Sequence, residues 1–440
     1  MQIAAFGVVS TALRPLGKNR SSLELGIDKT VSGENSELLL MFDPIYALLN
    51  EREWNEVSGT WLGDMMPHSP SNAPVVLYQV GKEKDDSKAT SRANRTVEYE
   101  VGLVDKVVAQ LETDPNDQDA LRQLIYPAAM GHLALIDGLK NYSGDKQDIK
   151  DKLAVYSQGS TLLTVLSLVA DPEFIDQNMP AGFPFNRVQV QAFCAANCFN
   201  LAKTTENPVW GYLGTYLTED MLRRFSTENS YGTYLSLDPS KERPPRTWDQ
   251  GYSLVPLARA YRLTGDQKFQ DAGRAIVDTT IRDLWDSNGG GFKVTPVDER
   301  RFLSDNCSVL AGMVEWADGD SMYAGTIQGV MDKTLAFFRR DLYRGGLLRH
   351  DITAGVTSAD ACTGCNFWAL DCMKGIARPR ALPQAYLPLV ANGEPTVRAA
   401  EQPKQNAYGE WARRVNITAV ANPVELFTAN GVKACLESLN

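Results

Sequence analysis

Several signatures of well-known chemistry are missing from this chain. No glycine-rich phosphate loop precedes a helix pattern, and no dinucleotide-binding glycine fingerprint is present. The common nucleotide and flavin sites are therefore excluded, and we predict no cofactor. The HExxH pattern of zinc peptidases and the GxSxG pattern of serine hydrolases are absent as well. No apolar run approaches the ~20 residues that span a bilayer, so we expect no membrane span.

Positive charge is also in short supply. The chain has 44 Lys and Arg against 54 Asp and Glu, a net charge of −10 at pH 7. Nucleic-acid-binding domains need a basic face, so we predict no nucleic-acid partner. The seven cysteines are an odd number without the spacing of small disulfide-rich domains. This pattern favours free thiols and a reducing compartment, which predicts a cytoplasmic protein.

One short pattern recurs along the chain: a helix-like stretch, then Gly-Asp, then a second helix-like stretch. The glycines of this pattern are Gly144, Gly265 and Gly319. Glycine takes the left-handed position after a helix at low cost, and the following Asp can cap the next helix. Gly-rich extended pieces alternate with this marker, and both recur with a period of about 55 residues. The period predicts a repeated helical hairpin.

The two helices of each expected hairpin differ in composition. The first, as in 188–203 and 304–317, is apolar and rich in small residues on nearly all sides, whereas the second carries its charges on one face. Helices buried on all sides form an inner layer, and amphipathic helices form an outer one. We therefore predict an all-α, (α/α)6-type toroid of hairpins with short β-like connections, as one domain over residues 1–440. A charged mobile insertion is expected at 81–98, and a Pro-rich connection at 378–404 before a C-terminal packing segment.

Acidic residues stand at the starts of three expected inner helices, at Asp249, Asp305 and Asp360. If those starts meet at one rim, paired carboxylates there can act as general acid and base. Asp is also a preferred helix cap, and this is the commoner explanation for each residue taken singly. Asp249 is the strongest candidate because Trp248 and Tyr252 beside it suit the wall of a pocket.

Histidine and cysteine offer fewer candidates. His350, Cys362, Cys365 and Cys372 lie close together, but the cysteines fall within a helix pattern and no second CxxC follows. We predict buried structural cysteines there and no metal. His132 lies on an apolar helix, as a core residue or as an acid–base group.

Cys194 and Cys198 are four residues apart on one helix face. Thiols can exchange protons where the surroundings lower their pKa. The alternative is small-residue packing, which is favoured for Cys198.

Two segments resemble linalool dehydratase/isomerase: MGHLALIDGLKNYSGD (130–145) and AGFPFNRVQVQAFCAANCFNLA (181–202), followed by GTYLSLDP (232–239). The resemblance implies an (α/α) barrel that works without a cofactor on monoterpene alcohols, by acid–base chemistry in an apolar cavity. His132 matches the family's histidine in its Gly-His-Leu motif, and Cys194 matches the second of its two cysteines. Phe185 takes the place of the first cysteine, and Asp43 is a loose counterpart of the family's early carboxylate.

The resemblance leads to a first functional hypothesis, a cofactor-independent lyase, isomerase or cyclase acting on a small apolar, terpene-like substrate. Because Phe185 breaks the thiol pair, a pericyclic ring closure such as an intramolecular Diels–Alder reaction is included. The catalytic candidates are His132, Cys194 and Asp43, and the substrate-binding candidates are Phe185, Trp248, Asp249, Tyr252 and Cys198.

Two other hypotheses stay open. The segment WDQGYSLVPLARAYRLTGD (248–266) resembles six-hairpin glycosidases and sugar epimerases, which implies a carbohydrate-active enzyme using Asp249 and Asp305. The last hypothesis is a helical scaffold without an active site. A closed apolar cavity would favour the terpene substrate, and a polar cleft with stacked Trp and carboxylates would favour a sugar. A homo-oligomer is compatible with all three.

Overall fold

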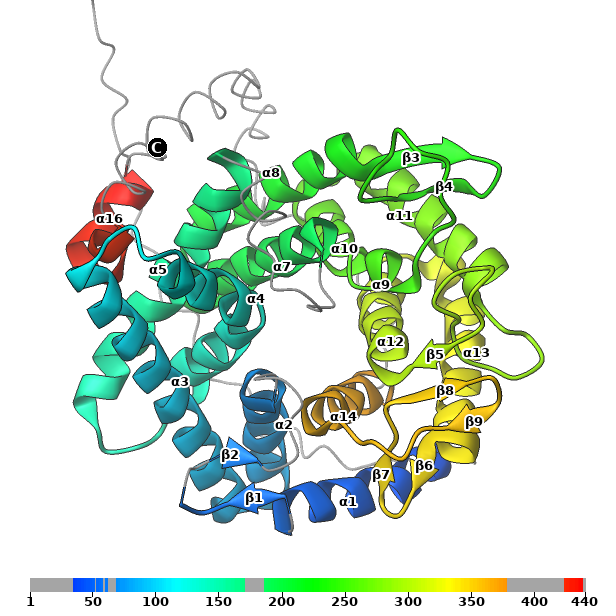
Figure 1. Ribbon diagram of the computed structural model, residues 1–440, viewed down its shortest axis with the longest axis horizontal. Helices are drawn as coiled ribbons and strands as arrows, with labels where there is room; N and C mark the ends of the chain where they lie inside the picture. The colour runs from blue at the N-terminus through cyan, green and yellow to red at the C-terminus, as the bar shows by residue number, and fades with distance from the viewer. Residues whose placement is uncertain are drawn as a thin grey trace, which may run out of the picture.

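The computed structural model describes residues 35–51, 53–57, 60–61, 69–170, 186–377 and 423–437. Helices of this part form a closed ring of two layers (Figure 1). The inner layer consists of α2 (Ser69–Lys84), α4 (Gln118–Asn141), α7 (Arg187–Thr205), α9 (Thr247–Gly251) with α10 (Leu254–Thr264), α12 (Leu303–Ala317) and α14 (Thr363–Ala377). The outer layer consists of α1 (Asn35–Glu51), α3 (Ser87–Thr113), α5 (Gln147–Ala170), α8 (Pro208–Phe225), α11 (Gln267–Thr279) and α13 (Ser321–Phe337). The predicted (α/α)6-type toroid is confirmed.

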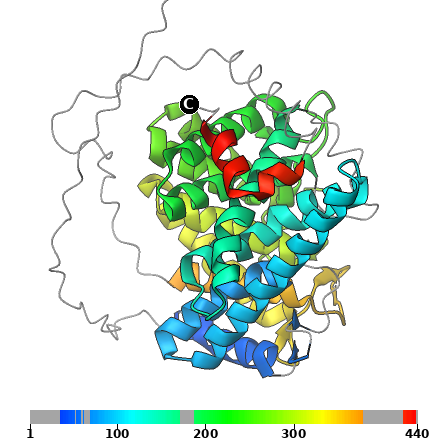
Figure 2. The ribbon, with the colours of Figure 1, turned by 90° about the vertical axis from the view of Figure 1, so that its left-hand side faces the viewer.

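Burial separates the two layers as the composition predicts. Helix α7 is buried almost without interruption from Val188 to Cys198, whereas α11 buries one face that includes Phe269, Ile276 and Val277. Helix α16 (Ala429–Glu437), preceded by a 3-10 turn (Pro423–Phe427), packs on the flank of the ring against α5 (Figure 2). In the described part of the chain, no helix is long and apolar enough to cross a membrane.

The strands are short connections between helices, as expected. They form antiparallel pairs β1 (Trp54–Asn55) with β2 (Thr60–Trp61), β3 (Ser226–Asn229) with β4 (Gly232–Leu235), and β6 (Tyr343–Arg344) with β7 (Leu347–Leu348). A three-stranded sheet joins β5 (Arg301–Phe302), β8 (Asp351–Thr353) and β9 (Val356–Thr357). Two outer helices end in π-helical turns, at Thr280–Leu284 and Phe338–Leu342.

The Gly-Asp marker has its expected structure at the second repeat. Gly265 ends α10 in the left-handed conformation, with φ +68°, and donates its N–H to the carbonyl of Tyr261. Asp266 then caps α11 by accepting a hydrogen bond from the N–H of Lys268. At the third repeat only the Asp keeps this role, since Asp320 caps α13.

The prediction of a mobile charged insertion at 81–98 is wrong. This segment contains the end of α2 and the first half of α3, joined at Asp86, whose carboxylate caps α3. Ala89, Ala93 and Val97 are fully buried and follow helical spacing, which anchors α3 to the core. The segment 378–404 lies outside the described residues.

Two glycines bring α9 and α12 into close contact. A Cβ on Gly312 would lie 2.0 Å from the carbonyl oxygen of Gly251, and a Cβ on Gly251 would lie 2.6 Å from the backbone nitrogen of Val309. No side chain fits between the helices at this crossing. The first turns of α9 and α12, which carry Asp249 and Asp305, are held together as a result.

Glu100 makes the stability of the ring depend on pH. It is buried in α3, and burial raises its pKa to about 8. The native state therefore holds a proton that the unfolded chain has lost, so stability falls as pH rises from ~4.5 and is lowest above ~8. One pKa unit corresponds to ~1.4 kcal/mol, so Glu100→Gln should stabilise the protein by ~4 kcal/mol at pH 9 and by little at pH 4.

Urea denaturation at the two pH values measures this difference. Glu112→Gln, on an exposed position of α3, is the matched control and should change neither value. Equal stability of the Glu100 variant and the wild type at pH 9 would show that the carboxylate has a compensating partner.

Candidate functional site

The inner helices α7, α9, α12 and α14 begin at the same end of the ring. Asn186, at the start of α7, donates its side-chain amide to the Asp249 carboxylate of α9 at 2.8 Å. Asp249 in turn acts electrostatically on Asp305 in the first turn of α12. Near the start of α12, the Cys307 thiol lies 4.0 Å from the Cys365 carbonyl oxygen of α14. We call this end of the ring the N-terminal rim.

The opposite end gathers the last turns of the same helices. Arg259 of α10 donates to the Asn200 side chain of α7 at 2.9 Å and pairs with Glu315 of α12 at 2.5 Å. We call this end the C-terminal rim. The inner helices are therefore parallel, which places their positive dipole ends at the N-terminal rim.

Asp249 is a carboxylate held in place by two amides. It is 2% exposed, and one of its oxygens accepts hydrogen bonds from the side chains of Asn186 and Gln189, at 2.8 and 2.7 Å. Asn186 and Gln189 also form the capping box of α7. Burial raises the pKa of Asp249, while the charge of Arg246 and the two amides oppose that rise. The amides thus favour the ionised form of a buried acid.

Asp305 has different surroundings, although it is also buried. The hydroxyl of Ser304 donates a long hydrogen bond of 3.5 Å to the Asp305 carboxylate. Burial raises the pKa of Asp305 to about 7, Arg246 opposes the rise, and the charge of Asp249 adds to it. The rim therefore combines one acid whose ionised form accepts two amide hydrogen bonds with a neighbour whose pKa is raised to about 7.

Four aromatic rings cross the hub of the ring between the two rims. Tyr252 stacks on Phe193 with centroids 4.0 Å apart, and Trp248 meets Trp368 edge to face at 5.5 Å. Tyr252 and Trp368 are also in edge contact, at 6.1 Å. Two of the three predicted substrate-binding aromatics, Trp248 and Tyr252, are thus brought together in one layer, next to Asp249.

A cavity of about 550 Å³ opens on the other side of this layer, at the C-terminal rim. Phe193, Tyr252 and Trp368 line it together with charged and amide side chains, which are Asn72, Asp137, Lys140, Asn200, Lys203, Arg259, Glu315 and Asp371. Asp137 and Asp371 interact electrostatically, and burial together with that interaction raises the pKa of Asp137 to about 7. Apolar residues such as Leu133, Ile136 and Val255 complete the lining, so the cavity is mixed and carries more charged groups than the apolar cavity expected for a terpene-like substrate.

Only some of the candidates taken from the linalool dehydratase resemblance have described side chains. Asp43 lies on α1 at the outside of the ring, where it forms an exposed ion pair with Lys84 at 2.8 Å. His132 belongs to α4, which contributes Leu133 and Ile136 to the cavity, but its side chain is not among those described. Phe185 lies outside the described residues.

The two cysteines of α7 are packing residues in this structure. Cys194 and Cys198 are fully buried, and the Cys194 sulfur lies 4.0 Å from the carbonyl of Thr161. Burial and a hydrogen bond with Cys198 raise the pKa of Cys194 well above the ordinary value. Thiolate chemistry needs a lowered pKa, so this surrounding disfavours it.

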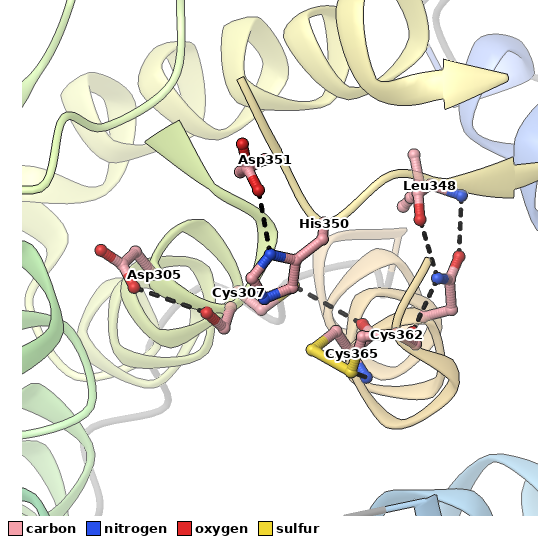
Figure 3. Close-up of a disulfide and its surroundings, with 9 residues drawn as sticks. Asp305, Cys307, Leu348, His350, Asp351, Cys362 and Cys365 are labelled. Carbon is pink, nitrogen blue, oxygen red and sulfur yellow. Dashed lines mark hydrogen bonds and ion pairs between the residues drawn. A yellow bond between two sulfur atoms is a disulfide. The ribbon is translucent and has the colours of Figure 1, made fainter. Parts of the chain in front are cut away.

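The N-terminal rim also holds a disulfide, which the sequence analysis did not predict. Cys362 and Cys365 are joined at the start of α14 (Figure 3), while the other five cysteines, Cys194, Cys198, Cys307, Cys372 and Cys435, form no disulfide. The expectation of free thiols is therefore wrong for this pair. Within the described part of the chain, no group of three or more His, Cys, Asp or Glu side chains is placed to hold a metal ion.

His350, considered from the sequence only as a metal ligand, lies at the N-terminal rim. Its carbonyl accepts the N–H of Leu303 at 2.8 Å, which fixes it beside the first turn of α12, and its Nδ1 lies 3.1 Å from Asp351 (Figure 3). In the sequence it follows a Gly-rich turn and looks like a loop residue. Its place at the rim depends on the pairing of β5 with β8, which local sequence does not reveal.

Comparison with known proteins identifies the fold. No family model and no curated protein matches the chain. Among solved structures, the unsaturated glucuronyl hydrolase of Bacillus sp. GL1 superposes with a TM-score of 0.55 at 13% identity, over 78% of this chain and 97% of its own. A D-mannose isomerase gives 0.52 at 10% identity, over 78% and 97%. The cellobiose 2-epimerase of Spirochaeta thermophila gives 0.51 at 14%, over 80% and 98%.

These matches overturn the terpene hypothesis. The proteins that share the fold are named for reactions on sugars, and the cavity of this chain is lined by charged and amide groups as well as by apolar ones. The linalool dehydratase part of the resemblance is not supported, whereas the six-hairpin part is confirmed. The described chain is an (α/α)6 toroid of the type found in six-hairpin glycosidase-like enzymes.

Proposed function

We propose that the protein is a carbohydrate-active enzyme that uses Asp305 and Asp249 at the N-terminal rim as its acid–base pair. The proposal depends on one observation: two neighbouring buried carboxyls have different contacts, which act differently on their pKa values. Two side-chain amides bind the Asp249 carboxylate and oppose the rise in pKa that burial causes, while burial and the nearby charge of Asp249 raise the pKa of Asp305 to about 7 against the charge of Arg246 and only one weak hydrogen bond. Such a split assigns an acid and a base within one pair.

Hydrolysis of a glycosidic bond is the reaction that this pair suits best. Asp305 would give its proton to the leaving oxygen as the bond between that oxygen and the anomeric carbon breaks. A water molecule would add to the anomeric carbon and pass its proton to Asp249. Arg246 would moderate the charge of both acids, since it acts electrostatically on each of them.

The aromatic layer supports a sugar substrate. Trp248 directly precedes Asp249 in the sequence, and its ring packs on Trp368 in the hub. Indole faces commonly pack on the apolar C–H faces of sugar rings, while carboxylates and amides bind hydroxyl groups. The combination of stacked Trp and carboxylates is the one expected for a sugar site, in contrast to a closed apolar cavity.

A saccharide panel tests the proposal. The panel takes its substrates from the names of proteins that share the fold. It consists of mannan, an unsaturated glucuronyl disaccharide, cellobiose and D-mannose. Chromatography of the products should show conversion of at least one of them by the wild type and by Asp266→Asn, a helix cap on the outer layer. Asp249→Asn should lose that conversion. No conversion of any saccharide, or full activity of Asp249→Asn, would refute the proposal.

The pH dependence of the reaction should reflect the two carboxyls. Asp305 must be protonated to act as the acid, and its pKa is raised to about 7, so kcat/KM should fall as pH increases above ~7. Asp249 must be ionised, and its pKa is raised as well, so activity should also fall on the acid side, above the ordinary range of an Asp. A rate that stays level from pH 7 to 9 would exclude Asp305 as the acid.

A further inference from the structure

The cavity at the C-terminal rim is separate from the acid pair. Asp305 lies in the first turn of α12. Glu315, which lines the cavity, lies in the last turn of the same helix. Ten residues of α-helix rise by ~15 Å, so no single sugar ring can touch both. The aromatic layer of Phe193, Tyr252 and Trp368 lies between them and forms the inner wall of the cavity.

Two polar side chains in the cavity wall have no partner. Asn72 is 7% exposed and lines the cavity, yet its amide forms no hydrogen bond within the described chain. The carboxyl of Asp137 is likewise without a hydrogen bond to any described residue, although Asp371 acts on it electrostatically. Asn72 is buried and Asp137 is half-buried. Their donors and acceptors are therefore available to a molecule that binds in the cavity.

The charges of the cavity nearly balance. Glu315 and Asp371 face Lys140, Lys203 and Arg259, and Asp137 is only partly ionised near neutral pH because its pKa is raised to about 7. Glu315 and Arg259 neutralise one another in an ion pair at 2.5 Å, and Lys140 and Lys203 are exposed at the mouth. Neither an anion nor a cation gains from this arrangement as a whole, so the site suits an uncharged molecule.

The unpaired groups define what that molecule must offer. An amide can donate and accept at once, and a carboxyl that keeps its proton near neutral pH can do the same. Vicinal hydroxyl groups match such side chains, and the Trp368, Tyr252 and Phe193 rings offer a surface for apolar C–H faces. A terpene hydrocarbon would leave Asn72 and Asp137 without partners, at the cost of burying them further.

We propose that the cavity at the C-terminal rim is a second binding site, for an uncharged saccharide of one or two rings, contacted by Asn72, Asp137 and Trp368. Its volume of about 550 Å³ lies within the ordinary range for small-molecule sites. The site binds without the acid pair, and it does not depend on the function proposed for the N-terminal rim.

Calorimetric titration of the Asp305→Asn protein with D-mannose and with cellobiose tests this site where turnover is suppressed. We expect binding of at least one sugar, with Kd raised tenfold or more by adding Asn72→Ala or the isosteric Asp137→Asn. Asn116→Ala, an exposed amide outside the cavity, should leave Kd within twofold. Circular dichroism melting confirms that each variant is folded, and the Asp137→Asn protein serves where Asn72→Ala is unstable.

The outcomes separate the two proposals. Binding that persists in Asp305→Asn and is lost with Asn72 or Asp137 supports the second site, whether or not the saccharide panel gives turnover. Binding that is unaffected by both cavity variants overturns it and leaves the acid pair as the sugar site. Absence of sugar binding to Asp305→Asn, when the wild type still turns over a saccharide, overturns it as well.

Discussion

Asp305→Asn should lower kcat by ~10³-fold on the saccharide that the wild type converts, with little change in KM. General acid catalysis by a positioned side chain is worth ~10²–10⁴-fold, and asparagine keeps the shape of the side chain but has no proton of suitable acidity to give. The rim tolerates the neutral side chain, because the Asp305 carboxyl is already protonated near neutral pH. The loss should therefore be one of chemistry and not of folding.

Two comparisons make this result specific. An activated substrate with a nitrophenol leaving group needs less help from an acid, so the variant should recover much of its rate on it. Asp266→Asn, a cap of α11 away from the rim, should keep wild-type kcat. A loss below tenfold on the natural glycosidic bond would contradict the role of Asp305, and an equal loss on both substrates would point to misfolding.

Gly312→Ala should destabilise the ring by ~3 kcal/mol. The added Cβ would lie 2.0 Å from the carbonyl oxygen of Gly251 and 2.9 Å from the Cβ of Leu254. A backbone oxygen cannot move aside as a flexible side chain can, so α9 and α12 must separate. Overpacking of this kind costs ~1–3 kcal/mol or more, and it exceeds the ~1 kcal/mol that alanine gains over glycine in a helix.

Gly325→Ala is the matched control for this change. Gly325 lies within α13, and a Cβ there meets nothing within 4 Å, so alanine should stabilise the protein by up to ~1 kcal/mol. Urea denaturation gives both values. Because the α9–α12 crossing also sets the separation of Asp249 and Asp305, Gly312→Ala should reduce activity in the fraction that stays folded. A variant as stable as the wild type would contradict the close crossing.

The fold was predictable because its signals are local. The left-handed glycine at 265 and the capping Asp at 266 and 320 act within one turn of chain, and the burial of an inner helix such as α7 is evident in its composition. The segment 81–98 shows that a prediction from charged residues alone can be wrong. Its lysines and acids suggest a solvated loop, but Ala89, Ala93 and Val97 among them already follow the spacing of a buried helix face.

The site was less predictable, since its properties arise between distant residues. Asp249 and Asp305 were identified from their places at helix starts, and the structure brings them together. The polarity of the cavity depends on Asp137, Arg259 and Asp371, which lie on three different helices and form no motif. Local resemblance at 130–145 and 181–202 therefore suggested a substrate class that the structural matches contradict.

Crystallography of the Asp305→Asn protein soaked with the saccharide that the wild type converts tests the central claim most directly. The account predicts a sugar ring at the N-terminal rim, with its glycosidic oxygen within hydrogen-bond distance of the side chain at 305 and a water between the ring and Asp249. A sugar bound only in the cavity at the C-terminal rim, or no sugar at saturating concentration, would contradict the assignment of the acid pair.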